Sequence, residues 1–259
     1  MFTGLFTDKT ALLTAATSGI GLQSARLIAE GGARAVVLNG RDAESGQAAV
    51  DLIKQAAPDC DVSFVAADLT EAEQVEEMYG QVLAEHGRVD VQVHAGGAQV
   101  KPNLFVNTDP ADYQPLIDGH FGSILNCCRF AVPAMIEQGN GSIVVVVSDA
   151  GKVATPAETI IGAMKAAAIM FVRTLAMEVS RNGVRVNAVS PSLVTDTKSH
   201  DRVMSGEMGR RVFEKATARA KLGLPGPADV ANTAVFLASP LAAKITGQAV
   251  SVNGGISAA

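Results

Sequence analysis

Residues 14–21 form the first segment whose residue types and spacing could carry chemistry. They read Thr-Ala-Ala-Thr-Ser-Gly-Ile-Gly and follow a short apolar run that begins at Thr10. Glycines in a turn between a strand and a helix let the backbone approach a pyrophosphate, and the start of the helix offers unpaired N–H groups and a positive dipole end. This turn therefore predicts a nucleotide site. Its predicted contacts are Thr14, Ser18, Gly19, Ile20 and Gly21.

The elements around this turn alternate between strand and helix. The run at 142–147 is almost pure Val and Ile, which is typical of a strand buried on both faces of a parallel sheet. Regular alternation predicts a single α/β domain over 1–259, with a doubly wound, seven-stranded, mostly parallel sheet and helices on both faces. Predicted strands are 10–14, 35–38, 62–66, 90–94, 142–147, 184–189 and 249–252. Predicted helices are 18–30, 43–55, 71–86, 111–138, 159–181 and 229–238.

The segment 190–227 breaks this alternation. A long irregular insertion late in a compact fold is often a substrate loop or lid. An amphipathic surface helix with a solvated basic face is the alternative. The basic residues of the segment are Arg210, Arg211, Lys215, Arg219 and Lys221.

Composition excludes several classes of protein. The formal charge is −5, from 21 basic and 26 acidic residues, which argues against nucleic-acid binding. No uncharged apolar run is long enough to cross a bilayer, and residues 1–9 lack the pattern of a signal peptide. The three cysteines, Cys60, Cys127 and Cys128, have no metal-like spacing. They indicate buried reduced thiols in a cytoplasmic protein, and we expect no metal site.

Together, the glycine turn, the βα order and three C-terminal segments resemble the short-chain dehydrogenase/reductase family over nearly the whole chain. Those segments are Phe236-Leu237-Ala238-Ser239, Thr246-Gly247-Gln248 and Asn253-Gly254-Gly255. The resemblance implies a Rossmann-type fold, a nicotinamide dinucleotide cofactor and hydride transfer.

The resemblance also implies the chemical residues. In that family a tyrosine exchanges the substrate's hydroxyl proton, a lysine four residues later lowers the pKa of the tyrosine, and a serine orients the carbonyl. The serine corresponds to Ser148 and the lysine to Lys165, which would also contact the nicotinamide ribose. The tyrosine position holds Ile161, which has no ionisable proton, and the position of the family's asparagine holds His120.

Several nucleotide positions depart from the family pattern. Ala15 replaces the first glycine of the turn. NAD-preferring members usually hold an acidic residue where this chain has Gly40, and Arg41 follows, which could pair with a 2′-phosphate. We therefore expect NADP(H). The resemblance places four further residues along the cofactor: Asp68, Leu69, Gly96 and Val194.

The threonine that the family holds near the nicotinamide corresponds to Asp196, where a carboxylate would face the cofactor's phosphates. With no tyrosine at 161, His120 is the best candidate for a replacement acid, because the pKa of an imidazole lies near neutrality. Lys165 is a second candidate if desolvation lowers its pKa. Asp149 should point to the other side of its strand, and Tyr113 should pack at the rim.

Three functions stay open at this point. The first is an NADP(H)-dependent oxidoreductase that acts on a hydroxyl or keto substrate, CoA-linked among the options, with a non-tyrosine acid. The second is a silent subunit that pairs with itself or with an active homologue through the helices at 111–138 and 159–181. The third is a nucleotide-sensing module.

Overall fold

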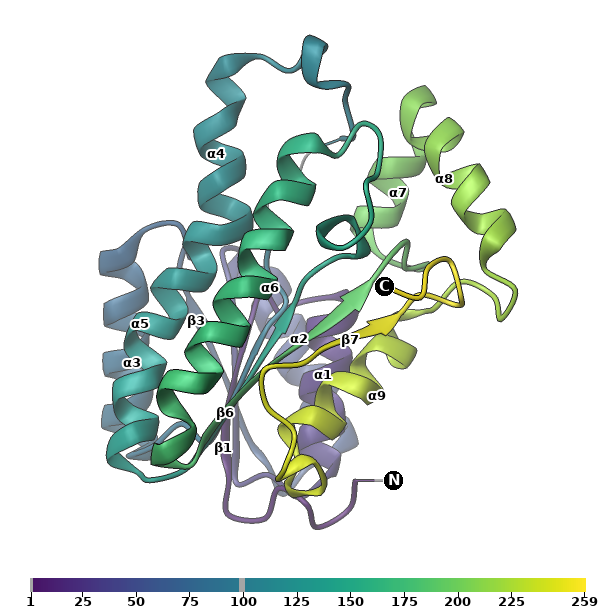
Figure 1. Ribbon diagram of the computed structural model, residues 1–259. Coiled ribbons are helices and arrows are strands. Elements are labelled where there is room, and N and C mark those ends of the chain that lie inside the picture. The colour runs from purple at the N-terminus through teal and green to yellow at the C-terminus, as the bar shows by residue number, and fades with distance from the viewer. Residues whose placement is uncertain (1, 98–100) are drawn as a thin grey trace.

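The computed structural model describes residues 2–97 and 101–259. Seven strands form one parallel sheet in the order β3-β2-β1-β4-β5-β6-β7, which confirms the predicted fold class (Figure 1). The order reverses between β1 and β4, and the crevice at such a switch is the usual ligand site of a doubly wound sheet. The strands are β1 (Thr10–Thr14), β2 (Ala35–Gly40), β3 (Asp61–Ala66), β4 (Val91–His94), β5 (Gly141–Val146), β6 (Val184–Pro191) and β7 (Ala249–Val252).

Helices cover both faces of the sheet. Side chains alternate along each strand, so Leu13 of β1 packs under α1, α2 and α9, while Leu12 packs under α3, α5 and α6. Figure 1 shows α1 and α9 on the face opposite to α5 and α6. The helices are α1 (Gly19–Glu30), α2 (Ala43–Ala56), α3 (Ala72–His86), α4 (Tyr113–Ile117), α5 (Ser123–Glu137), α6 (Thr159–Val179), α7 (Lys198–Met204), α8 (Glu207–Arg219) and α9 (Pro227–Ala238).

The helix predicted at 111–138 is not continuous. A π-helical turn, Asp118–Gly122, separates α4 from α5. This turn contains two glycines, which weaken an α-helix, and π-turns inside helices frequently occur at functional sites. The turn carries His120 into the protein, where its side chain is 7% exposed.

The segment at 190–227 is largely helical. It contains α7 and α8, which pack on a small apolar cluster of their own around Leu193, Val203 and Phe213. Figure 1 shows both helices beyond the carboxyl ends of β6 and β7. The segment is therefore not irregular. The alternative, an amphipathic surface helix with a solvated basic face, describes α8, which buries one side against this cluster and exposes its basic side chains.

The helix α6 and the 3₁₀ turn after it, Thr159–Asn182, are long and apolar enough to span a membrane by length and composition, with a mean hydropathy of 1.6. One side of α6 is buried on the sheet, through residues such as Ala168, Val172 and Ala176. The 3₁₀ turn after α6 ends at Gly183, whose φ of +76° is left-handed.

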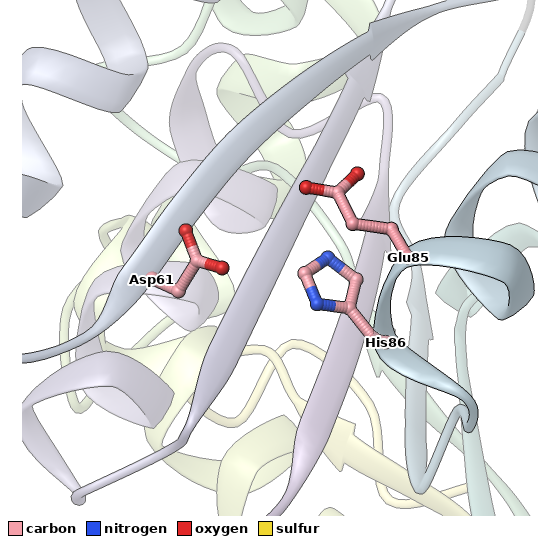
Figure 2. A group of neighbouring side chains, drawn as sticks. All are labelled: Asp61, Glu85 and His86. Atoms are coloured by element: carbon pink, nitrogen blue, oxygen red, sulfur yellow. The ribbon is translucent and has the colours of Figure 1, made fainter.

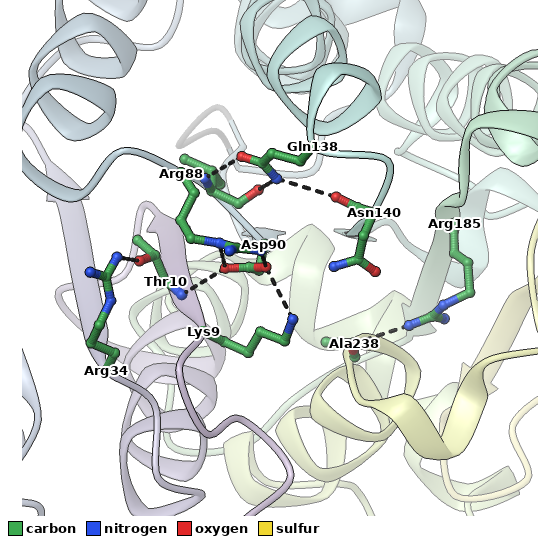
Figure 3. Close-up of polar contacts among 10 residues, drawn as sticks. Lys9, Thr10, Arg34, Arg88, Asp90, Gln138, Asn140, Arg185 and Ala238 are labelled. Carbon is green, nitrogen blue, oxygen red and sulfur yellow. Dashed lines mark hydrogen bonds and ion pairs between the residues drawn. The ribbon is translucent and has the colours of Figure 1, made fainter.

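A buried carboxylate joins the strands at the amino end of the sheet (Figure 3). The Asp90 carboxylate accepts hydrogen bonds from the Thr10 backbone N–H at 3.0 Å, from Arg88 at 2.5 and 2.7 Å, and from Lys9 at 3.2 Å. Burial alone would raise the pKa of Asp90. The hydrogen bonds from Arg88 and Thr10 and the charge of Lys9 outweigh burial and hold that pKa below its ordinary value.

Asp90→Ala should lower the free energy of unfolding by roughly 3 kcal/mol, because it leaves the buried Thr10 N–H without its acceptor and two cations without their counter-charge. The folded pKa of Asp90 is depressed, so its contribution is present above the unfolded pKa of about 4 and is lost as pH falls through the folded value. Urea unfolding at pH 7 and pH 3 should therefore show a difference from wild type that shrinks in acid. Asp59→Ala, at an exposed position, is the control.

Candidate active site

The carboxyl ends of β1, β4, β5 and β6 surround a cavity of about 320 Å³ at the switch in strand order. The structure brings many of the sequence-predicted residues together around it. The predicted residues that line the cavity are Ser18, Gly19, Ile20, Gly21, Gly96, His120, Ser148, Ile161, Lys165 and Val194.

The glycine turn fits a pyrophosphate. A Cβ at Gly21 would lie 2.8 Å from Ala16 Cα, so only glycine permits this close packing of turn and helix. Ser18 precedes α1 without a side-chain hydrogen bond to the helix start, which leaves the first N–H groups of α1 facing the cavity. The buried Asn39 fixes the turn from behind, because its side chain accepts from the Ala15 N–H at 3.3 Å.

Four predicted cofactor contacts lie outside this cavity. Thr14 is fully buried, and its hydroxyl bonds Nδ1 of His94 at 2.9 Å. Leu69 packs in the apolar cluster beneath α3. Arg41 and Asp68 form an ion pair with each other at 3.6 Å, at the outer end of the turn.

Packing at the end of β2 explains why residue 40 is a glycine. A Cβ there would lie 2.7 Å from Cγ2 of Thr17. An acidic side chain at this place would therefore have to displace Thr17, and Arg41 is the next side chain available to a ribose substituent.

The expectation that Asp196 faces the cofactor's phosphates is wrong. Asp196 is exposed, has a left-handed φ of 56° and does not line the cavity, whereas its neighbour Thr197 does. The Asp196 carboxylate accepts a hydrogen bond from the Thr195 hydroxyl at 3.2 Å instead.

In the part of the cavity that holds the predicted catalytic residues, the Lys165 amine is buried and donates to the carbonyl of Val146 at 3.5 Å. The Ser148 hydroxyl lies at the end of β5 and accepts from the Ala150 N–H at 3.3 Å. Ile161 places an aliphatic side chain in the same cavity wall.

Neither tyrosine of the chain lines this cavity. Tyr79 is buried in α3 and bonds Gln92. Tyr113 stacks on Phe105, with ring centroids 6.0 Å apart. Asp149 is buried beside Ser148, and its Oδ2 accepts from Asn253 and Ser257, away from the cavity. The hydroxyls of the two tyrosines and the carboxylate of Asp149 are therefore unavailable as acids in this cavity.

Burial controls the pKa values of the site. It lowers the pKa of Lys165 to about 8, although a nearby carboxylate, Glu158, raises it in part. Burial and then the charge of Lys165 lower the pKa of His120 to about 3. Neither ring nitrogen of His120 has a partner among the described residues. At neutral pH this imidazole is uncharged, so it cannot release a proton as an imidazolium.

Sequence reasoning missed Glu158, which also lines the cavity. It precedes α6, three residues before Ile161 and seven before Lys165. Residues at these spacings lie on one side of a helix, and this spacing was the available signal. Burial raises the pKa of the Glu158 carboxyl to about 7, against the opposing charge of Lys165.

A second cavity of about 440 Å³ adjoins the first and shares Ser148, Glu158, Ser192 and Phe213 with it. Its lining combines apolar side chains, such as Val153, Val212 and Ile256, with three of the cations predicted for the lid, which are Arg211, Lys215 and Arg219.

Away from the cavity, Asp61, Glu85 and His86 lie together at the amino end of the sheet (Figure 2). One ligand atom from each lies within 4.8 Å of the others. Both carboxylates are exposed, and we assign this cluster no role. The three cysteines are buried and unpaired, as predicted.

The sequence of this chain matches known proteins from end to end. A sequence model of the family described as enoyl-(acyl carrier protein) reductase matches residues 14–257. The 3-oxoacyl-[acyl-carrier-protein] reductase FabG of Chlamydia trachomatis is 33% identical over 255 residues, which are 98% of this chain and 99% of that protein. The chain belongs to the short-chain dehydrogenase/reductase family of oxidoreductases.

Solved structures agree with this membership. A short-chain type dehydrogenase/reductase of Mycobacterium ulcerans has a TM-score of 0.89 and 26% identity, over 97% of this chain and 90% of its own. A 7α-hydroxysteroid dehydrogenase, solved with NADH and 7-oxo glycochenodeoxycholic acid, has a TM-score of 0.89 and 27% identity, over 98% of this chain and 96% of its own.

Ala15 stands where the family pattern has a glycine, and the free energy of its backbone strain can be measured. Its φ of 52° is left-handed, which costs a residue with a Cβ about 1–2 kcal/mol. Ala15→Gly should therefore stabilise the chain by about 1 kcal/mol, after allowance for the entropy of glycine. The matched control is Ala16→Gly, at a buried neighbour without positive φ, and it should destabilise. If both variants lost the same free energy of unfolding in urea, the result would contradict backbone strain at Ala15.

Proposed function

We propose that this chain is an NADP(H)-dependent oxidoreductase that interconverts a keto and a hydroxyl group without a tyrosine acid. The observation that carries this proposal is one cavity lined by the glycine turn, Ser148 and Lys165. The turn suits a pyrophosphate, and the other two residues suit a carbonyl and a ribose at the far end of the same space.

Each residue has a definite task in this proposal. NADPH, when bound, supplies a hydride at its nicotinamide ring. The start of α1 holds the pyrophosphate, and Ser148 donates a hydrogen bond to the substrate's carbonyl oxygen. The buried ammonium of Lys165 stabilises negative charge that develops on that oxygen and holds the nicotinamide ribose.

The choice of NADP(H) rests on the outer end of the turn. Gly40 offers no carboxylate to the ribose 2′-hydroxyl, whereas Arg41 lies next to it with a 66% exposed side chain. A 2′-phosphate would compete with Asp68 for this guanidinium. Arginine binds phosphate through two parallel hydrogen bonds, which favours the phosphate in that exchange.

The second cavity suits a thioester of an acyl chain with an anionic carrier. Its apolar side chains fit the acyl chain, and Arg211, Lys215 and Arg219 fit phosphate groups. The related FabG proteins are named for a 3-oxoacyl group on a carrier protein, which agrees with this substrate class. Acetoacetyl-CoA is therefore the first substrate to test.

Purified chain should bind NADPH about tenfold more tightly than NADH, and Arg41→Ala should abolish this difference because it removes the cation for the 2′-phosphate. Nicotinamide fluorescence measures both dissociation constants. Arg26→Ala is the matched control, since this exposed arginine pairs with Glu30 on α1.

The chain should then reduce acetoacetyl-CoA slowly with NADPH, and Lys165→Met should abolish this activity. An absence of NADPH binding at millimolar concentration would overturn the proposed function. Equal affinity for both cofactors in the wild-type chain would overturn only the choice of NADP(H).

The exposed apolar side chains of α5 and α6 favour a second candidate function, that of a subunit that assembles without catalysing. Met170 and Met177 on α6 are 57% and 77% exposed, and their spacing of seven places them on one side of the helix. Leu125 and Ile136 on α5 are exposed as well. Such a surface suits a helix pair of a second short-chain dehydrogenase/reductase subunit.

Met170→Glu combined with Met177→Glu should convert an oligomer to a monomer, because two charges would be buried at the contact. Sedimentation velocity measures the mass. Leu222→Glu, at a position that is 89% exposed after α8, should leave the mass unchanged. An unchanged mass in the double variant would exclude this surface. An assembled wild-type chain that binds no NADPH would favour the silent subunit.

A further inference from the structure

Glu158 is a carboxylic acid in the wall of the cavity that holds Ser148. It lines the cavity together with Ser148, Ile161 and Lys165. Its backbone carbonyl accepts from the Gly162 N–H at 2.6 Å, which fixes it at the first turn of α6. Glu158 is the residue before α6, and Ile161 and Lys165 follow it by three and seven residues, so all three can line the same cavity.

The Glu158 carboxylate has no hydrogen bond or ion pair among the described residues. The Lys165 ammonium is the first charge that influences it, and the uncharged His120 lies in the same cavity. The same cavity is also lined by Lys198, His200 and Arg202. Glu158 lines two adjoining cavities as well, the one of about 440 Å³ and a third of about 190 Å³, whose other titratable side chains are Lys101, Asp112, Asp149, Arg211, Lys215 and Arg219. A partly buried carboxyl without a partner is free to bond a substrate.

The protonation state of Glu158 suits acid–base chemistry. Burial raises its pKa to about 7, so both forms are present at neutral pH. A general acid works best when its pKa lies near the working pH. Neutral His120 lacks an acidic proton at this pH. Lys165 stabilises negative charge on the substrate oxygen best while its own ammonium stays protonated.

We propose that Glu158 is the proton donor and acceptor of this site, in place of a phenol at position 161. This inference rests on the proposed function. In the reducing direction, the carbonyl carbon gains a hydride and the oxygen takes the proton of the Glu158 carboxyl, so that C=O becomes CH–OH and the nicotinamide is oxidised. The carboxylate then regains a proton from water, which reaches it through adjoining cavities of about 190 and 440 Å³.

Glu158→Gln is the decisive variant, because the amide keeps the size of the side chain and loses the proton. It should reduce kcat for acetoacetyl-CoA about 10²–10³-fold, and leave the Kd of NADPH unchanged. In the wild-type chain, reduction should slow as pH rises through about 7, and the variant should lose this dependence. Glu178→Gln, at an exposed position of the same helix, should match wild type throughout.

A second readout needs no turnover. In ¹³C NMR of carboxyl-labelled glutamate, the resonance missing from Glu158→Gln identifies Glu158. Its midpoint should lie near 7 in the chain without cofactor, and Lys165→Met should raise it, because removing a cation favours the neutral acid. A midpoint in the ordinary range of glutamate, or no response to Lys165→Met, overturns the role of Glu158.

These outcomes separate the two proposals. If wild type reduces acetoacetyl-CoA and Glu158→Gln does so equally well, only the role of Glu158 falls. If wild type binds NADPH and reduces no keto substrate, the role of Glu158 and the proposed turnover fall together. The double variant Glu158→Gln with Ile161→Tyr should regain turnover, because the phenol restores an acid beside Lys165.

Discussion

After burial itself, the Lys165 ammonium is the charge that shifts the pKa values of three neighbouring groups in this site. It is 5% exposed and donates to one carbonyl, so its charge is poorly screened. It helps to hold both buried histidines, His94 and His120, in their neutral forms. It also opposes the rise in the pKa of Glu158. Any account of chemistry in the cavity therefore depends on how this charge is balanced.

Lys165 lies at the carboxyl end of the sheet, whereas the ion pairs of Asp90, which stabilise the fold, lie at its amino end. Parallel strands bring their carboxyl ends to one edge, where the glycine turn, Ser148 and the helix that carries Lys165 meet. The amino ends are joined by Asp90, whose carboxylate forms ion pairs with both Lys9 and Arg88. Because stability and chemistry use different ends, substitutions in the cavity can accumulate while the fold remains intact.

Most of the fold could be predicted from the sequence, since short β-branched runs alternate with helical stretches and this alternation specifies a doubly wound parallel sheet. The break in the helix at 111–138 was not predicted, although the π-turn contains two glycines, because the apolar pattern continues through it. Residue type and spacing were enough to predict that Ser148 and Lys165 belong to one cavity, which both of them line. Glu158 was missed because a pKa shift depends on the folded surroundings of a group: burial lowers the pKa of His120 to about 3 and raises that of Glu158 to about 7.

Ile161 lines the cavity between Glu158 and Lys165, one helical turn from each in sequence. A tyrosine here would offer its hydroxyl to Glu158 or Lys165 and would draw water into the space between them. Isoleucine offers no hydrogen bond and lowers the local dielectric constant, which penalises an ionised carboxylate. Burial raises the pKa of the Glu158 carboxyl to about 7, and the aliphatic side chain of Ile161 forms part of the wall of the cavity that this carboxyl lines.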